Sequence, residues 1–149
     1  MPDDNPRSIV SVRGHPIHAM LVPFPFVCFV GTLLTDIAYW KTTDVMWEIF
    51  SDWLLLAGLA IAAFAVLAGL IDFVGSRRVR AIKVAWLHVA GNVLAIVLAI
   101  INAFVHSRDG YTAIVPTGLT LSLLVVLLLC VTGWMGKTMI YRHRVGVSN

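Results

Sequence analysis

The stretch VAWLHVAGNVLAIVLAIINAFV, residues 84–105, contains no Lys, Arg, Asp or Glu. A helix needs roughly 20 apolar residues to cross the hydrocarbon core of a bilayer, and only a regular helix satisfies its own backbone hydrogen bonds there. The stretch therefore predicts a transmembrane helix over about residues 84–106. Its polar side chains, His88 and Asn92, must then find hydrogen-bond partners inside the membrane.

Three further stretches have the same apolar character, and they predict spans over about residues 16–40, 53–75 and 112–136. Short polar connections join the spans, such as KTTD, GSRRVR and HSRDG. Charged residues make up 13% of the chain, about half of the ~25% found in soluble domains. We therefore expect an all-α integral membrane protein, a four-helix up-down bundle, with residues 1–14 as an N-terminal tail and residues 15–149 as the transmembrane domain.

Lys and Arg are distributed unequally between the two sides that this arrangement defines. One side would hold Lys41 and Arg108, and the other would hold Arg7, Arg13, Arg77, Arg78, Arg80, Lys83, Lys137, Arg142 and Arg144. Because cytoplasmic loops carry the excess of Lys and Arg, both termini are predicted to be cytoplasmic, with the protein in a plasma membrane. This distribution also argues against a nucleic-acid partner, since the cations follow the membrane topology.

Two spans carry stripes of small or polar residues at steps of three and four, a spacing that places them on one helix face. In the second span the stripe is Gly58, Ala62, Ala65, Gly69 and Asp72. In the third span it is His88, Asn92, Ala95, Ala99, Asn102 and His106. Small residues let membrane helices approach closely, so we expect these two stripes to meet in the bundle interior.

Five side chains from four helices are expected to converge in the cytoplasmic half of the bundle: His15, His18, Asp72, His88 and His143. Intramembrane ionisable residues are costly to bury and usually serve a function. The outer half is expected to be apolar and packed by small residues. There, His106 is expected to lie at the membrane surface without a special role.

The first hypothesis for the histidine layer is a redox protein that holds one b-type haem. His88 would be one axial ligand, with His18 or His15 opposite, and His143 and Asn92 nearby. The haem propionates would meet a cluster of arginines at the membrane edge, namely Arg77, Arg78 and Arg80.

Three alternatives remain open on the same residues. Zinc or another divalent metal would take three or four ligands, for which His15, His18, His88 and Asp72 are the candidates. A quinone or proton-relay site would use histidines that titrate rather than ligate. A structural subunit would bind no cofactor and would dock on a larger membrane complex through the stripe from Gly58 to Gly69. The sequence shows no catalytic motif, and it does not identify a redox partner protein or an oligomeric state.

Four motifs occur in a fixed order: GHPIHAMLVPFPF at residues 14–26, GLID at 69–72, the pair His88 and Asn92, and GWMGKTMIYRHRVGV at 133–147. With them the chain resembles a bacterial family of predicted membrane proteins, domain of unknown function 2231, over about residues 14–147. The resemblance implies a four-helix membrane domain. Members are sometimes joined to Rieske-type iron–sulfur domains, which implies redox chemistry.

The family pattern implies a set of functional positions, which in this sequence are His15, His18, Asp72, His88, Asn92, Tyr141 and His143. The chain departs from that pattern at two places. Many members carry a further histidine at the position of Pro23, and a glycine at the position of Arg144. The first departure removes a ligand that a metal site of this family would use.

Overall fold

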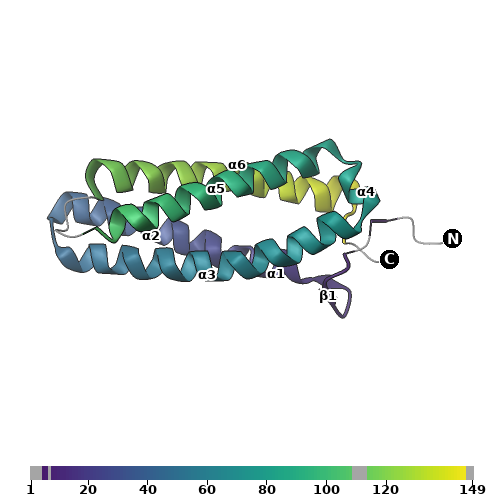
Figure 1. Ribbon diagram of the computed structural model, residues 1–149, viewed down its shortest axis with the longest axis horizontal. Coiled ribbons are helices and arrows are strands. Elements are labelled where there is room, and N and C mark those ends of the chain that lie inside the picture. The colour runs from purple at the N-terminus through teal and green to yellow at the C-terminus, as the bar shows by residue number, and fades with distance from the viewer. Residues whose placement is uncertain (1–4, 7, 109–113, 147–149) are drawn as a thin grey trace.

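The computed structural model describes residues 5–6, 8–108 and 114–146, and its elements are almost all helices (Figure 1). In chain order they are β1 (Ser11–Val12), β2 (His15–Pro16), α1 (Ile17–Leu21), α2 (Pro23–Thr42), α3 (Val45–Gly75), α4 (Arg77–Arg80), α5 (Lys83–His106), η1 (Ile114–Gly118) and α6 (Leu119–His143). The long helices lie side by side, with the N- and C-termini at one end of the molecule (Figure 1). We call this the termini end and the opposite one the distal end.

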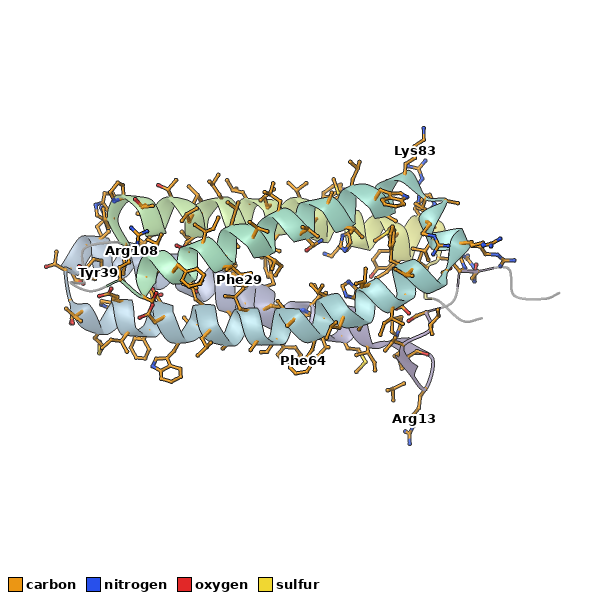
Figure 2. All side chains as sticks on the ribbon, in the orientation of Figure 1. Arg13, Phe29, Tyr39, Phe64, Lys83 and Arg108 are labelled. Carbon is orange, nitrogen blue, oxygen red and sulfur yellow. The ribbon has the colours of Figure 1, made fainter. Side chains whose placement is uncertain are left out.

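Four helical segments are long and apolar enough to cross a membrane, which confirms the predicted fold class of an all-α membrane protein. They are Ile17–Thr42, Val45–Gly75, Lys83–His106 and Ile114–His143. Large apolar side chains project outward along all four, as Figure 2 shows for Phe64 of α3. Phe64 is 65% exposed, and Leu34, Phe104 and Leu127 are each more than half exposed. A bilayer is the solvent that such a surface requires.

Two helices extend beyond the predicted spans. Helix α3 begins at Val45 because the carboxylate of Asp44 accepts a hydrogen bond from the backbone N–H of Met46 at 3.0 Å, which caps the helix. The polar residues that precede the predicted second span therefore belong to the helix. Helix α6 continues to His143 instead of ending near residue 136. The first two residues of the predicted fourth span, 112 and 113, lie outside the described residues.

Part of the predicted N-terminal tail, residues 1–14, is docked on the bundle. Its strand β1 pairs with β2 in a short hairpin. The carboxylate of Asp72, near the end of α3, accepts hydrogen bonds from Ser8 Oγ at 2.7 Å and from the backbone N–H groups of Ile9 and Val10 at 2.6 and 2.9 Å. Residues 1–4 and 7 lie outside the described part of the chain.

A layer of apolar side chains crosses the middle of the bundle, with one buried residue from each long helix: Phe29, Leu55, Ala99 and Val125. On α3, α5 and α6, buried or half-buried polar residues lie on both sides of this apolar layer, whereas on α2 they lie on the distal side and His18 of α1 provides the polar group on the other. The interior thus holds two separate polar regions, one toward the termini end and one toward the distal end.

The glycines of the α3 stripe pack against the helices that precede it. A Cβ on Gly58 would lie 3.0 Å from the ring of Phe29 in α2, and a Cβ on Gly69 would lie 2.7 Å from the ring of His18 in α1. These glycines therefore face α1 and α2, while α3 also packs against α5. The α5 stripe is an interior face as predicted, since Ala95, Ala99, Asn102 and His106 are at most 2% exposed.

Candidate functional site

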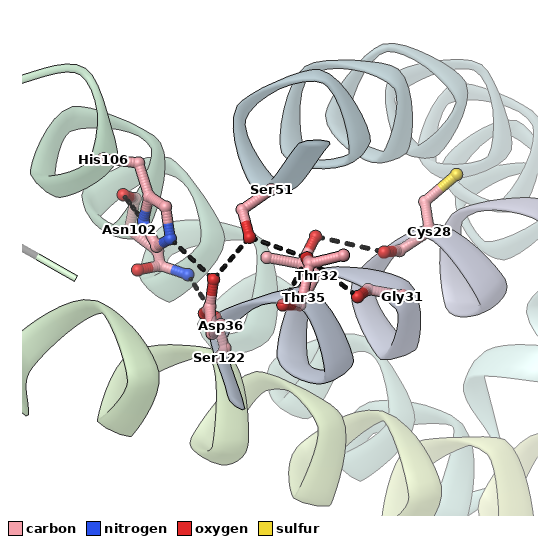
Figure 3. Close-up of polar contacts among 9 residues, drawn as sticks. All are labelled: Cys28, Gly31, Thr32, Thr35, Asp36, Ser51, Asn102, His106 and Ser122. Atoms are coloured by element: carbon pink, nitrogen blue, oxygen red, sulfur yellow. Dashed lines mark hydrogen bonds and ion pairs between the residues drawn. The ribbon is translucent and has the colours of Figure 1, made fainter. Parts of the chain in front are cut away.

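The most deeply buried polar group of the described chain is a cluster near the distal end, centred on Asp36 of α2 (Figure 3). The Asp36 carboxylate is fully buried. It accepts a hydrogen bond from Ser51 Oγ of α3 at 2.6 Å and another from Ser122 Oγ of α6 at 2.5 Å. His106 Nε2 of α5 lies 3.0 Å from the same carboxylate. One carboxylate therefore connects all four long helices.

Further polar groups form hydrogen bonds with these partners of Asp36 and orient them. Asn102 Nδ2 donates to Ser122 Oγ at 2.8 Å, and the Thr35 hydroxyl lies 2.7 Å from Ser51 Oγ. His106 Nδ1 lies 3.0 Å from the backbone carbonyl oxygen of Asn102, one helical turn earlier. We call Asp36, Ser51, Asn102, His106 and Ser122 the distal cluster. Together these bonds hold the imidazole and the carboxylate in one orientation.

The sequence predicts that His106 lies at the membrane surface in an apolar outer half of the bundle, but the structure buries it within a polar cluster. His106 is 2% exposed, and its ring packs on Gly118, where a Cβ would lie 2.7 Å from Cε1. The physical reason is that the C-terminal end of α5 lies beside the interior-facing side of α2. The last side chain of α5 therefore contacts Asp36 instead of water.

Two buried oxygens beside this region have no hydrogen-bond partner within the described residues: Glu48 Oε2 and Asn102 Oδ1. Glu48 is 2% exposed although it lies in the first turn of α3. Buried acceptors without a donor are costly, so such atoms mark places where a proton or another donor is required.

Sequence spacing held a signal for the distal cluster that the prediction missed. Thr32 and Asp36 are four residues apart on α2, and Asn102 and His106 are four residues apart on α5. Polar residues at this spacing share a helix face, and an apolar span tolerates them only where they meet other polar groups. Glu48 and Ser51 precede the predicted second span. They belong to the helix because α3 begins early, at the Asp44 cap.

A second polar region, toward the termini end, contains two facing histidines, His18 of α1 and His88 of α5. Their ring centres are 6.1 Å apart and their planes are nearly perpendicular, at 87°. His18 Nδ1 lies 2.8 Å from the carbonyl oxygen of Ala65, and His88 Nδ1 lies 2.9 Å from the carbonyl oxygen of Thr132. A carbonyl oxygen only accepts, so each Nδ1 carries a proton, and Nε2 keeps its lone pair when the imidazole is neutral. We call His18 and His88 the histidine pair.

A glycine lies beside each ring of the histidine pair. Gly69 of α3 adjoins His18, and a Cβ on Gly136 of α6 would lie 3.3 Å from His88 Cε1. These glycines thus have a purpose beyond general helix packing, because they provide space for imidazoles. Near His88, Asn92 Nδ2 donates to the His88 carbonyl oxygen at 2.7 Å, and Asn92 Oδ1 accepts from Thr132 Oγ1 at 3.4 Å.

The remaining predicted site residues lie elsewhere. His15 is exposed on the β1–β2 hairpin, and His143 is half-buried at the last position of α6. Arg80 Nη1 donates to the carbonyl oxygens of Phe73 and Val74 at the end of α3. Two exposed arginines line a cavity of about 330 Å³ at the termini end, with walls from Asn5, Pro6, Ile9, Gly75, Ser76, Arg77 and Arg78.

The four-ligand metal set predicted from the sequence is not assembled. Asp72 is engaged by the segment from Ser8 to Val10, and His15 is exposed on its hairpin, so only His18 and His88 come together. No group of three or more His, Cys, Asp or Glu side chains suited to a metal ion occurs among the described residues.

Comparison with known proteins places the chain in a family but adds no function. No curated protein and no solved structure matches it. The model of one protein family matches residues 14–149, which include both polar regions and all four spans. The chain therefore belongs to the family of predicted membrane proteins DUF2231.

Proposed function

We propose that this membrane protein is redox-related and holds one b-type haem between His18 and His88. The observation that carries the proposal is the histidine pair itself, two imidazoles from different helices with ring centres 6.1 Å apart. Two imidazoles that share one ion, at metal–nitrogen distances of about 2 Å, have ring centres roughly 6 Å apart. The spacing of the pair is therefore that of two ligands on a single ion.

The hydrogen bonds of the pair are those of metal-ligating histidines. A ligating imidazole usually donates its second N–H to a carbonyl or carboxylate oxygen, which selects the tautomer and orients the ring. The carbonyls of Ala65 and Thr132 provide this support for His18 and His88. Both Nε2 atoms are thereby left in the state that a metal ion needs.

The number of donors distinguishes haem from a free metal ion. A structural or catalytic zinc site takes at least three protein ligands, and the described residues offer no such group. Haem iron takes its four equatorial nitrogens from the macrocycle and needs only two axial ligands from the protein. When bound, the haem supplies a one-electron couple, while His18 and His88 hold and orient it.

A macrocycle would have to enter between two sides of the bundle. The ring of His18 packs against α3 and the ring of His88 packs against α6, so the group would be held between these two sides. The cavity of about 330 Å³ at the termini end does not border the histidine pair, so binding requires the sides to part. Arg77 and Arg78, exposed at the same end of the bundle, are the propionate partners that this arrangement offers.

The visible spectrum of the protein, purified after expression with ample haem supply, tests the proposal. We expect a b-type spectrum that His18→Ala and His88→Ala each abolish. His15→Ala is the matched control, because it removes an exposed imidazole three residues from His18, and it should leave the spectrum unchanged. A folded but colourless wild-type protein would contradict haem binding and would favour the structural-subunit hypothesis.

We further propose that the protein lies in the plasma membrane with both termini in the cytoplasm. The support is the concentration of Lys and Arg at the termini end, where Figure 2 shows Arg13 and Lys83, while Arg108 lies at the distal end. A green fluorescent protein fused after residue 149 should fluoresce, since it folds in the cytoplasm. Alkaline phosphatase fused there should be inactive, and an active phosphatase fusion would reverse the assigned orientation.

A further inference from the structure

The protonation of the two ring nitrogens of His106 follows from the atoms that each nitrogen faces. His106 Nδ1 points at the carbonyl oxygen of Asn102 at 3.0 Å, and a carbonyl oxygen has no proton to give. Nδ1 must therefore carry a proton. The ring's other nitrogen, Nε2, faces Asp36 Oδ1 at 3.0 Å, and a hydrogen bond at that distance needs one proton between the two atoms.

The proton shared by Asp36 and His106 can occupy two positions, and the number of protons in the pair is the same for both. It can sit on Nε2, which makes a histidinium and a carboxylate, or on Oδ1, which makes a neutral pair. The Asp36–His106 pair has zero net charge in both cases. Ser51 and Ser122 donate their own protons to the carboxylate, so neither hydroxyl proton is the one shared with His106.

We propose that the distal cluster is a proton-binding site that holds one proton between Asp36 and His106, and that this proton keeps α2 packed against α5. Both side chains are fully buried, so an imbalance of charge there is not screened by water. Loss of the proton would leave a carboxylate facing a nitrogen lone pair. Gain of a second proton would leave an unpaired histidinium. Either change separates the two helices.

Among the described residues, α3 contributes ionisable groups around the site. Glu48 and Asp52 both interact electrostatically with Asp36 and His106. Helix α6 contributes the hydroxyl of Ser122, and η1 contributes no titratable side chain. The carboxylate of Glu48 is buried, and its Oε2 has no partner among the described residues. Asp52 is half-buried.

The proton is detected with the full chain in lipid nanodiscs, labelled with ¹⁵N-histidine. His106→Gln assigns the two His106 nitrogen signals. At neutral pH we expect protonated Nδ1 together with one of two results: a protonated Nε2, or a carboxylic-acid infrared band that Asp36→Asn removes. In Asp36→Asn the amide donates to Nε2, so Nε2 should be unprotonated and Nδ1 unchanged. His15, which is exposed on its hairpin, is the internal control.

The coupling to packing is measured as the melting temperature over a range of pH. Wild type should lose stability at alkaline pH, whereas Asp36→Asn should show a flat profile over the same range. A wild-type His106 with unprotonated Nε2, in a protein that shows no carboxylic-acid infrared band, overturns the proposal, and this outcome is read without any variant at Asp36. Parallel pH profiles of the two proteins would also overturn it. Both measurements are independent of haem.

Discussion

Replacing Asp36 by alanine is expected to destabilise the protein by about 3–5 kcal/mol, the usual cost of removing one partner of a buried ion pair. The change leaves Ser51, Ser122 and His106 buried without the carboxylate that each of them contacts. It also opens a gap where four helices meet. Denaturant titration of the protein in mixed micelles, followed by circular dichroism, measures the loss in free energy of unfolding.

Asp44→Ala is the matched control for this prediction, because it makes the same substitution in the same part of the molecule. Asp44 is exposed and caps α3, so its removal should cost only about 1 kcal/mol. An Asp36→Ala protein that unfolds within 1 kcal/mol of Asp44→Ala would show that the distal cluster does not hold the bundle together.

Replacing Gly69 by alanine is expected to have the next largest effect, a loss of about 1–3 kcal/mol through overpacking. The added Cβ would lie 2.7 Å from Nδ1 and 3.0 Å from Cε1 of His18. The ring cannot move aside without breaking its bond to the Ala65 carbonyl oxygen at 2.8 Å. The loss exceeds the gain of up to about 1 kcal/mol that alanine brings to a helix interior.

Gly133→Ala in α6 separates this steric effect from helix propensity. A Cβ at Gly133 has no atom within 4 Å, so the substitution should stabilise the protein by up to about 1 kcal/mol. The measurement is the difference in free energy of unfolding between the two variants. Equal effects at both positions would mean that the ring of His18 does not rest on Gly69. If haem is bound, Gly69→Ala should also weaken its retention, since it displaces an axial ligand.

The histidine pair shows how far sequence could narrow the candidate site. The sequence indicates His88, because an imidazole inside an apolar span needs a partner, and it allows either His18 or His15 as that partner. The structure places His18 against His88 and leaves His15 exposed on a hairpin. His15 and His18 are only three residues apart, so the 3.6-residue period of a helix does not tell which of them would face His88. A break between α1 and α2 follows directly, which removes the regular helix that such an argument needs.

By itself the sequence determined the number of spans and the small or polar face of α5. Both depend on local composition and helical period, because an apolar run of sufficient length must be helical in a bilayer whatever its neighbours are. The structure confirmed the four apolar helices and the burial of the α5 stripe.

Only the tertiary structure decided which polar groups meet. Asp36 and His106 are 70 residues apart, and Asp72 was expected beside the histidines but binds the segment before the first span. The rotation and depth of each helix decide such contacts, and these depend on all its neighbours at once. The way the helices dock therefore determines which polar groups become partners inside a membrane. The bilayer determines only that each apolar segment is helical.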